Sequence, residues 1–409
     1  MEGLRNDNRL VCRKVQGTDM RPRAVLILLL SVALFWPCSR ASSEEQLGVV
    51  DRRPESGHFV EYRGQFLIPY KQPIPGSDAQ IKMTPVPAGK YRLQFLDDAG
   101  EPQSYSIYVE PFWIASTEIT WKQYRAFMEL DKAFRQFEQF EMRPVLDEPE
   151  IDVVSAPSEI YDADYRMHDE GGTDQHPAAT MTQFGAKAYT KYLSRLTGVN
   201  YRLPSAVEWR YAAHGPQGQP DEPYSADDLK EVAWFAGNAQ TRQLVGQKKA
   251  NAWGIHDMLG NVSEWVLDGE GYREQAFADK MKISSIDAVA WPTTFRQRWA
   301  LGGSYQSPLQ ECQYDSLVFS NDEFFEEDPM IPQSPHWTCS FVGQGVGFRI
   351  VRPWNNEFDK EMAKRYWEPD HPDMEETIGA YIEMGHVRKG LVDANLFKDL
   401  GEIGKRRRK

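Results

Sequence analysis

Apolar and polar positions along the chain follow two periods, and each period predicts short elements. Residues 104–109 alternate between apolar and polar side chains, which is typical of a strand with one buried face. In two other stretches apolar residues recur every three or four positions, so we predict helices over Thr120–Leu130 and Thr182–Leu196. A third, shorter helix is predicted from Ser205 to Ala213.

Capping signals at the ends of these segments support the helices. Thr120 is followed three positions later by Gln123, and Ser205 is followed by Glu208 at the same spacing. In both pairs the hydroxyl and the longer polar side chain can each accept a hydrogen bond from a free backbone N–H group. Gly198 follows the second segment and is suited to end a helix.

The pattern changes in the second half of the chain. Residues 231–352 contain little helical periodicity and many Gly, Asn and Asp turns. Asp359–Gly404 returns to amphipathic helix, and a basic tail, Lys405–Lys409, follows it. We find no internal repeat and no low-complexity tract.

The N-terminal part carries an apolar run, Ala24–Trp36, that is too short to span a bilayer comfortably. Arg21 and Arg23 precede it, and Ala41 ends a small-residue cleavage site, so we predict a signal peptide over residues 1–41. Met20 lies just before the arginines, which is consistent with an over-extended start over 1–19. We expect an exported protein with no transmembrane segment after cleavage; an uncleaved signal anchor is the alternative.

Composition narrows the class of protein. The chain has 409 residues, of which 41% are hydrophobic and 12% aromatic, so it is long and apolar enough to bury a core. Its formal net charge is −13 although both ends are basic, so the part between them is more acidic still. An acidic surface disfavours a nucleic-acid partner and suits cations or basic partners.

Several chemistries are missing from the sequence. There is no nucleotide-binding glycine loop, no HExxH zinc motif and no nucleophile elbow, and the histidines form no ligand-spaced pair on a helix. Only Cys312 and Cys339 remain after signal cleavage. They are equally consistent with one disulfide and with two free thiols.

Four stretches carry a specific signature because they occur together and in order. They are Tyr201–Ala213 (YRLPSAVEWRYAA), Trp253–Trp265 (WGIHDMLGNVSEW), Leu301–Tyr305 (LGGSY) and Gly347–Arg349 (GFR), preceded by Pro111–Thr120 (PFWIASTEIT). Together they resemble the formylglycine-generating enzyme, or sulfatase-modifying factor, superfamily. The chain is identified as a divergent member of it.

This resemblance implies the fold and the domain boundaries. The family fold is an irregular, C-type-lectin-like α+β domain with low regular secondary structure, and we place it over residues 83–352. The polar, proline-rich residues 42–82 are then an N-terminal arm, and 353–409 are a helical C-terminal extension with a basic tail.

Much of the signature serves the fold. Aromatic residues of the motifs are expected in the core; they are Trp209, Trp253, Trp265 and Phe348. The charged motif residues Arg202, Glu208 and Arg349 are expected to be buried partners in ion pairs.

The resemblance also implies a calcium site. Its ligands match the side chains of Asp257 and Glu264 and the backbone carbonyls of Gly260 and Val262. Oxygen ligands at this spacing suit a hard cation held by a tight loop. Asn238 matches one ligand of a second family calcium site, but the acidic partner loop of that site is missing from this sequence.

At the family's catalytic position the sequence departs from the pattern. Authentic oxidases of the family hold Cu(I) with two cysteines that follow the Gly-Gly-Ser motif, here Gly302 to Ser304. The first cysteine is replaced by Ser307 and the second is kept as Cys312. A hydroxyl is a hard donor and does not replace a thiolate on Cu(I), so copper binding is not expected. The tryptophan before the motif's glutamate is also lost and stands here as Ser263.

Two classes of function therefore compete. The first is a calcium-stabilised binding or structural module without copper-dependent formylglycine-generating activity, acting on an unknown protein or small-molecule ligand. The second is a formylglycine-generating or related oxidase that acts on a cysteine of a sulfatase-like client or on a small molecule. The loss of one soft copper ligand favours the first class.

Overall fold

The computed structural model describes residues 46–96, 100–145, 153–158, 173–218, 224–270, 282–294, 296–325, 334–338 and 342–406. Residues 1–45 form one unit of the chain and 46–409 the other. The predicted signal peptide therefore lies outside the described residues. Within the described part, no helix is long and apolar enough to cross a membrane.

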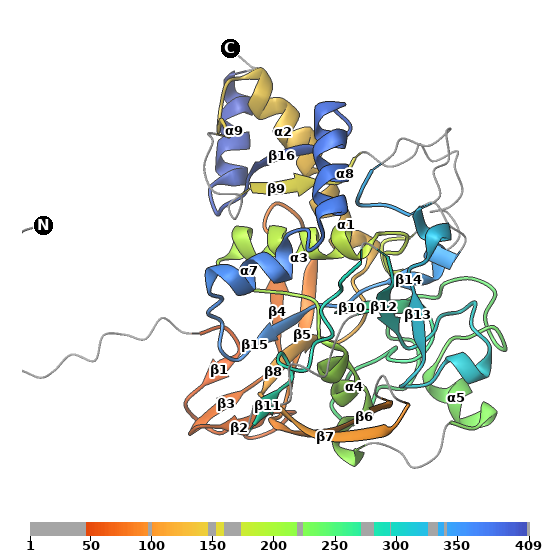
Figure 1. Cartoon of the computed structure of the whole chain (residues 1–409). Helices are drawn as coiled ribbons and strands as arrows, with labels where there is room; N and C mark the ends of the chain where they lie inside the picture. Colours follow the sequence, from red (N-terminus) through yellow and green to blue (C-terminus); the bar gives the residue numbers. More distant parts are fainter. Residues whose placement is uncertain are drawn as a thin grey trace, which may run out of the picture. The chain divides into compact units, whose positions relative to one another are not determined.

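In the described part of the chain, the strands form five small sheets (Figure 1). Two of them have four strands, in the orders β15-β8-β5-β4 and β13-β12-β10-β14; two have three, β11-β7-β6 and β1-β3-β2; and β16 pairs with β9. The strands are β1 (Val49–Val50), β2 (Val60–Tyr62), β3 (Gln65–Leu67), β4 (Tyr70–Pro73), β5 (Gln80–Val86), β6 (Gly89–Leu96), β7 (Pro102–Val109), β8 (Phe112–Ala115), β9 (Val153–Ala156), β10 (Ser263–Gly269), β11 (Ile283–Ser284), β12 (Arg298–Leu301), β13 (Leu317–Phe319), β14 (Val346–Gly347), β15 (Val351–Pro353) and β16 (Arg388–Leu391).

The helices are short and lie around these sheets. They are α1 (Trp121–Met128), α2 (Leu130–Gln139), α3 (Gln183–Thr197), α4 (Ala206–His214), α5 (Ala226–Val232), α7 (Lys360–Trp367), α8 (Pro372–Glu383) and α9 (Leu396–Arg406). The mixture of short helices and small sheets confirms the predicted α+β class.

The local signals in the sequence act as expected. Both capping boxes form, with Thr120 and Ser205 as the caps of α1 and α4. Gly198 ends α3 in the left-handed conformation at φ 71°, which a residue without a Cβ atom adopts at low cost. The predicted strand 104–109 lies within β7.

The N-terminal arm is predicted over residues 42–82, and its described part, 46–82, contributes strands to the folded body. β4 pairs with β5, and β5 pairs with β8 in the sheet that β15 completes. Leu67 and Ile74 are fully buried in this region. Burying such side chains removes apolar surface from water, so this segment is part of the core.

An aromatic cluster fills the centre of the larger hydrophobic core. Tyr124 stacks on Tyr189 at 5.5 Å between ring centroids and meets Phe348 edge to face at 5.9 Å. The motif aromatics Trp209, Trp265 and Phe348 are buried, with no more than 1% of each exposed, and Trp253 is 7% exposed. Their predicted placement in the core is confirmed.

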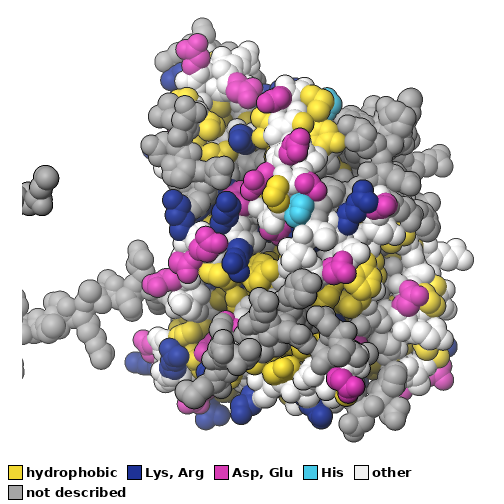
Figure 2. All heavy atoms as spheres, viewed as in Figure 1, with side chains coloured by type: hydrophobic (Ala, Val, Ile, Leu, Met, Phe, Trp, Pro, Cys, Tyr) yellow, Lys and Arg dark blue, Asp and Glu magenta, His cyan; other side chains and the backbone are white. Residues whose placement is uncertain are grey.

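The C-terminal extension packs on the family domain. In Figure 1, α8 and α9 lie with α2 and the β9–β16 pair at the end of the molecule that carries the C-terminus, and α3 and α7 lie below them. Trp367 of α7 is buried and donates its indole N–H to the carbonyl of Tyr201 at 2.9 Å. On the face seen in Figure 2, acidic and basic side chains are interspersed with small apolar areas.

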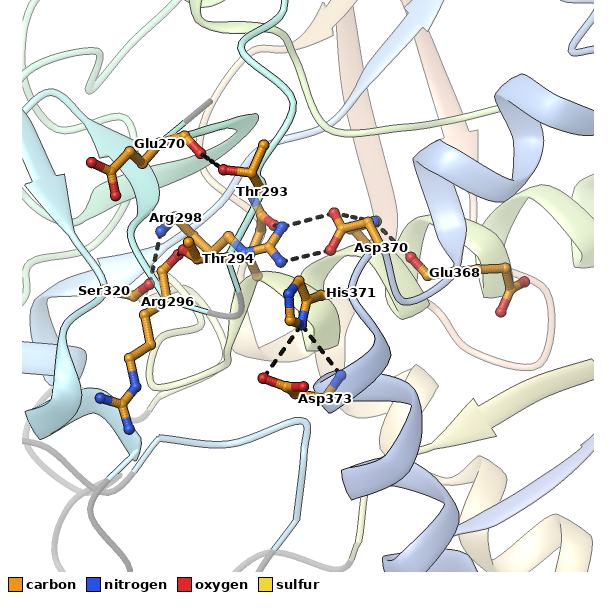
Figure 3. A network of polar contacts seen from close by, with 12 residues as sticks. Glu270, Thr293, Thr294, Arg296, Arg298, Ser320, Glu368, Asp370, His371 and Asp373 are labelled. Carbon is orange, nitrogen blue, oxygen red and sulfur yellow. Dashed lines mark hydrogen bonds and ion pairs between the residues drawn. The ribbon is translucent and has the colours of Figure 1, made fainter. Parts of the chain in front are cut away.

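A buried ion cluster fixes the extension to the domain between α7 and α8 (Figure 3). The guanidinium of Arg298 contacts both carboxylate oxygens of Asp370, each at 2.7 Å, and Lys187 reaches the same carboxylate at 3.2 Å. Although burial opposes ionisation, the two cations hold the pKa of Asp370 at about 2. The carboxylate is therefore ionised at neutral pH.

Candidate functional site

Two loops carry the family motifs, and strands β10 and β12 bring them together. β10 begins where the Asp257–Glu264 loop ends, and β12 ends at Leu301, directly before the Gly302–Cys312 loop. Glu264 is paired with Leu301 in this antiparallel ladder. Hydrogen bonds then join the loops, from the Gly260 N–H to the Gly302 carbonyl and from the Tyr305 N–H to the Asn261 carbonyl, both at 2.9 Å.

Glycines make this close approach possible. Gly260, Gly302 and Gly303 all have positive φ, between 70° and 93°. A Cβ atom on Gly260 would collide with the carbonyl oxygen of Trp234, and one on Gly303 would collide with that of Glu311. The motif glycines are therefore required by both backbone conformation and space.

Glu264, the predicted calcium ligand, is the partner of Arg349. The guanidinium contacts its two carboxylate oxygens at 2.5 and 2.6 Å, and the indole N–H of Trp209 donates to it at 2.7 Å. Glu264 and Arg349 are fully buried. Arg202 forms a similar buried bidentate pair with Glu208 at 2.7 and 2.8 Å. The expectation of buried ion pairs is confirmed for all three motif residues.

Asp257, the first predicted ligand, has one oxygen open. Oδ2 accepts the N–H of Gly246 at 2.6 Å, whereas the buried Oδ1 has no hydrogen-bond partner among the described residues. Asp257 has a φ of 53°, so the loop holds a non-glycine residue in the left-handed region. Burial raises the pKa of its carboxyl group.

Glu118 joins this buried acidic group, and the sequence analysis did not select it. Its Oε1 accepts the side-chain N–H of Asn261 at 3.0 Å, and Oε2 has no partner among the described residues. Burial, and then the charges of Asp257 and Glu264, raise the pKa of Glu118 well above its ordinary value. The sequence signal that could have selected Glu118 is its place in the PFWIASTEIT motif. No local pattern shows that Glu118, three residues after β8, lies near the loop that begins at Asp257.

This geometry fits a calcium ion in part. The open oxygen of Asp257 suits a hard cation, while the carboxylate of Glu264 already has the guanidinium as its counter-charge. Among the described residues, no group of three or more His, Cys, Asp or Glu side chains is arranged to hold a metal ion. The amide of Asn238, matched to a second calcium site, instead closes its own turn with Phe235 and Ala233.

The Ser304–Cys312 segment does not fit a copper ion. The hydroxyl of Ser307 accepts the N–H of Ser304 at 3.1 Å, so the position of the missing cysteine is part of a backbone turn. Cys312 is fully buried, and its thiol contacts the carbonyl of Ser304 at 3.6 Å. Burial raises the pKa of this thiol to about 12, so it is protonated at neutral pH and is a poor copper ligand. Cys339, and with it the disulfide alternative, lies outside the described residues.

Comparison with known families agrees with this arrangement. Residues 73–353, more than half of the chain, match the family described as the sulfatase-modifying factor enzyme 1-like domain. The chain belongs to this family. The resemblance found in the sequence is thereby confirmed, and the match begins within β4 (Tyr70–Pro73).

This chain also resembles curated proteins over short stretches. The chaperone protein LppX of Paenibacillus barcinonensis is 39% identical over an alignment of 93 residues, and the match covers 18% of this chain and 33% of LppX. The serine/threonine-protein kinase pkn1 of Chlamydia caviae is 34% identical over 103 residues, which are 25% of this chain and 15% of the kinase. The chain thus spans a third or less of the length of these relatives.

Solved structures that align with this chain have little sequence identity to it. Treponema denticola variable protein 1 is 17% identical with a TM-score of 0.47, and 70% of this chain and 99% of that chain are covered. PvdO from Pseudomonas aeruginosa is 19% identical with a TM-score of 0.42, and 67% and 94% are covered.

Proposed function

We propose that this chain is an exported sulfatase-modifying-factor-like protein that acts as a binding or structural module and lacks copper-dependent formylglycine-generating activity. The observation that carries the proposal is the state of the Ser304–Cys312 segment. It offers one buried, protonated thiol and a hydroxyl already engaged by the backbone, whereas Cu(I) requires soft, accessible donors.

The test is an assay for the family's reaction on the purified mature protein. A peptide of the Cys-x-Pro-x-Arg type is incubated with copper and a reductant, and mass spectrometry detects the aldehyde. We expect no aldehyde and no stoichiometric Cu(I) binding. Aldehyde formation that depends on Cys312 would establish the oxidase alternative.

A gain-of-function variant makes a negative result informative. Ser307→Cys restores a second sulfur at the position where the family has it. If the missing donor alone prevents copper binding, this variant is expected to bind Cu(I) while the unmodified protein does not. Ser316→Cys, which adds a thiol outside this segment, is the matched control.

Calcium stabilisation is the second part of the proposal. Asp257 would supply its open carboxylate oxygen, and the carbonyls of Gly260 and Val262 would complete the loop's contribution. The bound ion would supply positive charge and rigidity, since Oδ1 of Asp257 has no hydrogen-bond partner among the described residues.

The measurement is the melting temperature in calcium and in a chelator. We expect calcium to raise it in the unmodified protein and not in Asp257→Asn, which keeps the shape of the side chain but removes its charge. Asp227→Asn, on an exposed helix, is the control. Equal melting temperatures of the unmodified protein with and without calcium would remove calcium from the proposal.

A further inference from the structure

A cleft of about 710 Å³ adjoins the motif loop that carries Asp257, and most of its lining plays no part in the site described above. Its walls come from the end of α4, from α5, from residues 249–259 and from Tyr314. Tyr314 follows Cys312 by two residues, and Asp257 also lines the cleft. The cleft therefore joins the motif loops to a second part of the domain, and its volume suits a small organic molecule or a side chain.

His214, the last residue of α4, gives this cleft a buried polar group without a partner. The side chain is 7% exposed, and its Nε2 has no hydrogen-bond partner among the described residues. Its ring meets the ring of Tyr314 edge to face at 4.4 Å. Burial lowers the pKa of His214 to about 4, so the imidazole is neutral at pH 7 and adds no positive charge to the cleft.

Carboxylates dominate the charge of the lining. Asp228 and Glu231 come from α5, against a single lysine, Lys249, among the exposed charged residues that line the cleft. Asp228, Glu231 and Lys249 are exposed, whereas the carboxylate of Asp257 is buried and is assigned to calcium above, so it does not count toward the organic ligand. An excess of hydrogen-bond acceptors and negative charge favours a ligand that is a cationic donor.

Two tyrosines add aromatic faces to the acidic wall. The hydroxyl groups of Tyr224 and Tyr314 are hydrogen-bonded to each other at 2.8 Å, and the ring centroids are 5.7 Å apart. This bond holds the two rings in a fixed arrangement, with 60° between their planes. Aromatic faces attract ammonium and guanidinium groups, and the attraction grows when water is excluded.

We propose that this cleft binds an organic cation, an amine or guanidinium group, carried either by a free small molecule or by a basic side chain of a peptide. The inference rests on the binding role proposed above and names its ligand class. Neutral and anionic ligands are disfavoured because they leave the carboxylates without a counter-charge. An inorganic ion is disfavoured as the occupant of the cleft because the space is far larger than an ion.

The experiment compares charged and uncharged ligands of equal shape by calorimetry on the mature protein. The first pair is butylguanidine and butylurea. The second pair is a tripeptide with a central arginine and the same tripeptide with citrulline. We expect saturable binding of at least one cationic member and at least about tenfold weaker binding of its neutral isostere, a difference of about 1.4 kcal/mol. The first pair identifies a free ligand, and binding of the second pair alone identifies a peptide.

Variants on α5 locate the site without disturbing the core. Asp228→Asn combined with Glu231→Gln removes two exposed charges from the cleft wall. We expect this double variant to bind the cationic ligand about two- to fivefold more weakly. Asp227→Asn removes an exposed charge from the same helix outside the lining, and we expect no change.

Two results would overturn the cation site: equal affinity for the charged and uncharged members of both pairs, or unchanged affinity in the double variant. Neither result bears on the absence of oxidase activity. Conversely, aldehyde formation in the peptide assay contradicts the proposed function whatever the cleft binds, so the two failures are distinguishable.

Discussion

Arg349 and Glu264 form a buried ion pair that connects two of the family motifs. Both side chains are fully buried, and the guanidinium also donates to the carbonyls of Ala115 and His256 at 3.0 Å. A buried ion pair of this kind adds little stability compared with a well-packed apolar pair. Removal of one partner is costly, however, because it leaves an uncompensated buried charge. The ion pair therefore fixes how the segment after Gly347 packs against the loop that precedes β10.

Arg349→Met is expected to lower the free energy of unfolding by about 3–5 kcal/mol because Glu264 loses its counter-charge in the core. The measurement is chemical denaturation monitored by tryptophan fluorescence. Lys132→Met is the control, because Lys132 forms an exposed pair with Glu129 at 3.1 Å. The control should lose at most about 1 kcal/mol. Equal losses in the two variants would contradict the role given to Arg349.

Two effects require glycine at position 260, namely the backbone conformation and the lack of space for a Cβ atom. Gly254→Ala is expected to cost about 1–2 kcal/mol, because φ is 78° and nothing lies within 4 Å of the added Cβ. Gly260→Ala has a similar φ of 74° but also collides with the Trp234 carbonyl, so we expect about 1–3 kcal/mol more. Denaturation of both variants measures the difference, and identical losses would show that the loop relaxes freely.

At the scale of elements, the ion cluster at Asp370 connects α3, β12 and the segment between α7 and α8. Lys187 and Arg298 are nearly completely buried, so each depends on this carboxylate for its counter-charge. The helices of the extension also bury apolar residues, including Leu396 and Ile403 of α9. Electrostatic and apolar contacts thus act together in fixing the extension.

Asp370→Asn is expected to lower stability at pH 7 by about 2 kcal/mol, which corresponds to a pKa held at about 2 rather than its ordinary value. The folded-state pKa is depressed, so this stabilisation is fully present above about pH 4 and is lost as the pH falls through about 2. The difference between the two proteins should therefore shrink over that range in acid titrations of stability.

Asp373→Asn is the matched control for this titration. Asp373 lies in the first turn of α8 beside His371 (Figure 3), and its side chain is 70% exposed. We expect little change in stability at any pH. A difference between the Asp370 variant and the unmodified protein that persists at pH 2 would contradict the ion-cluster explanation.

At the scale of the whole molecule, the family domain and the extension share one core. Trp367 is hydrogen-bonded to the Tyr201 carbonyl of the YRLP motif, and Arg202 lies over the ring of Tyr366 at 5.2 Å. The extension therefore covers residues that belong to the family signature. The boundary at 353 marks the end of the sequence match and not the end of a separate packing unit.

Truncation after Pro353 is expected to lower the melting temperature sharply and broaden the transition, because α3 loses the partners of Lys187 and the core loses Trp367. Circular dichroism during heating measures it. Removal of the basic tail 405–409 alone should leave the transition unchanged, since Lys405 forms only an exposed pair. A truncated protein with an unchanged transition would contradict a shared core.

The sequence by itself determined the features that depend on neighbours along the chain. Periodicity and capping residues predict α1, α3 and α4, because a helix cap is satisfied within three or four residues. The ordered motifs identify the family, and Ser307 alone predicts the loss of a soft copper ligand. The domain's α+β class follows from the family.

Tertiary structure alone decided how distant residues meet. The sequence does not show that Arg349 neutralises Glu264 or that Glu118 joins Asp257, because these contacts span 85 and well over 100 positions. It also does not reveal the cleft at His214, whose walls come from four separate segments. Burial sets the protonation of each of these groups, and burial depends on the packing of the whole chain rather than on local pattern.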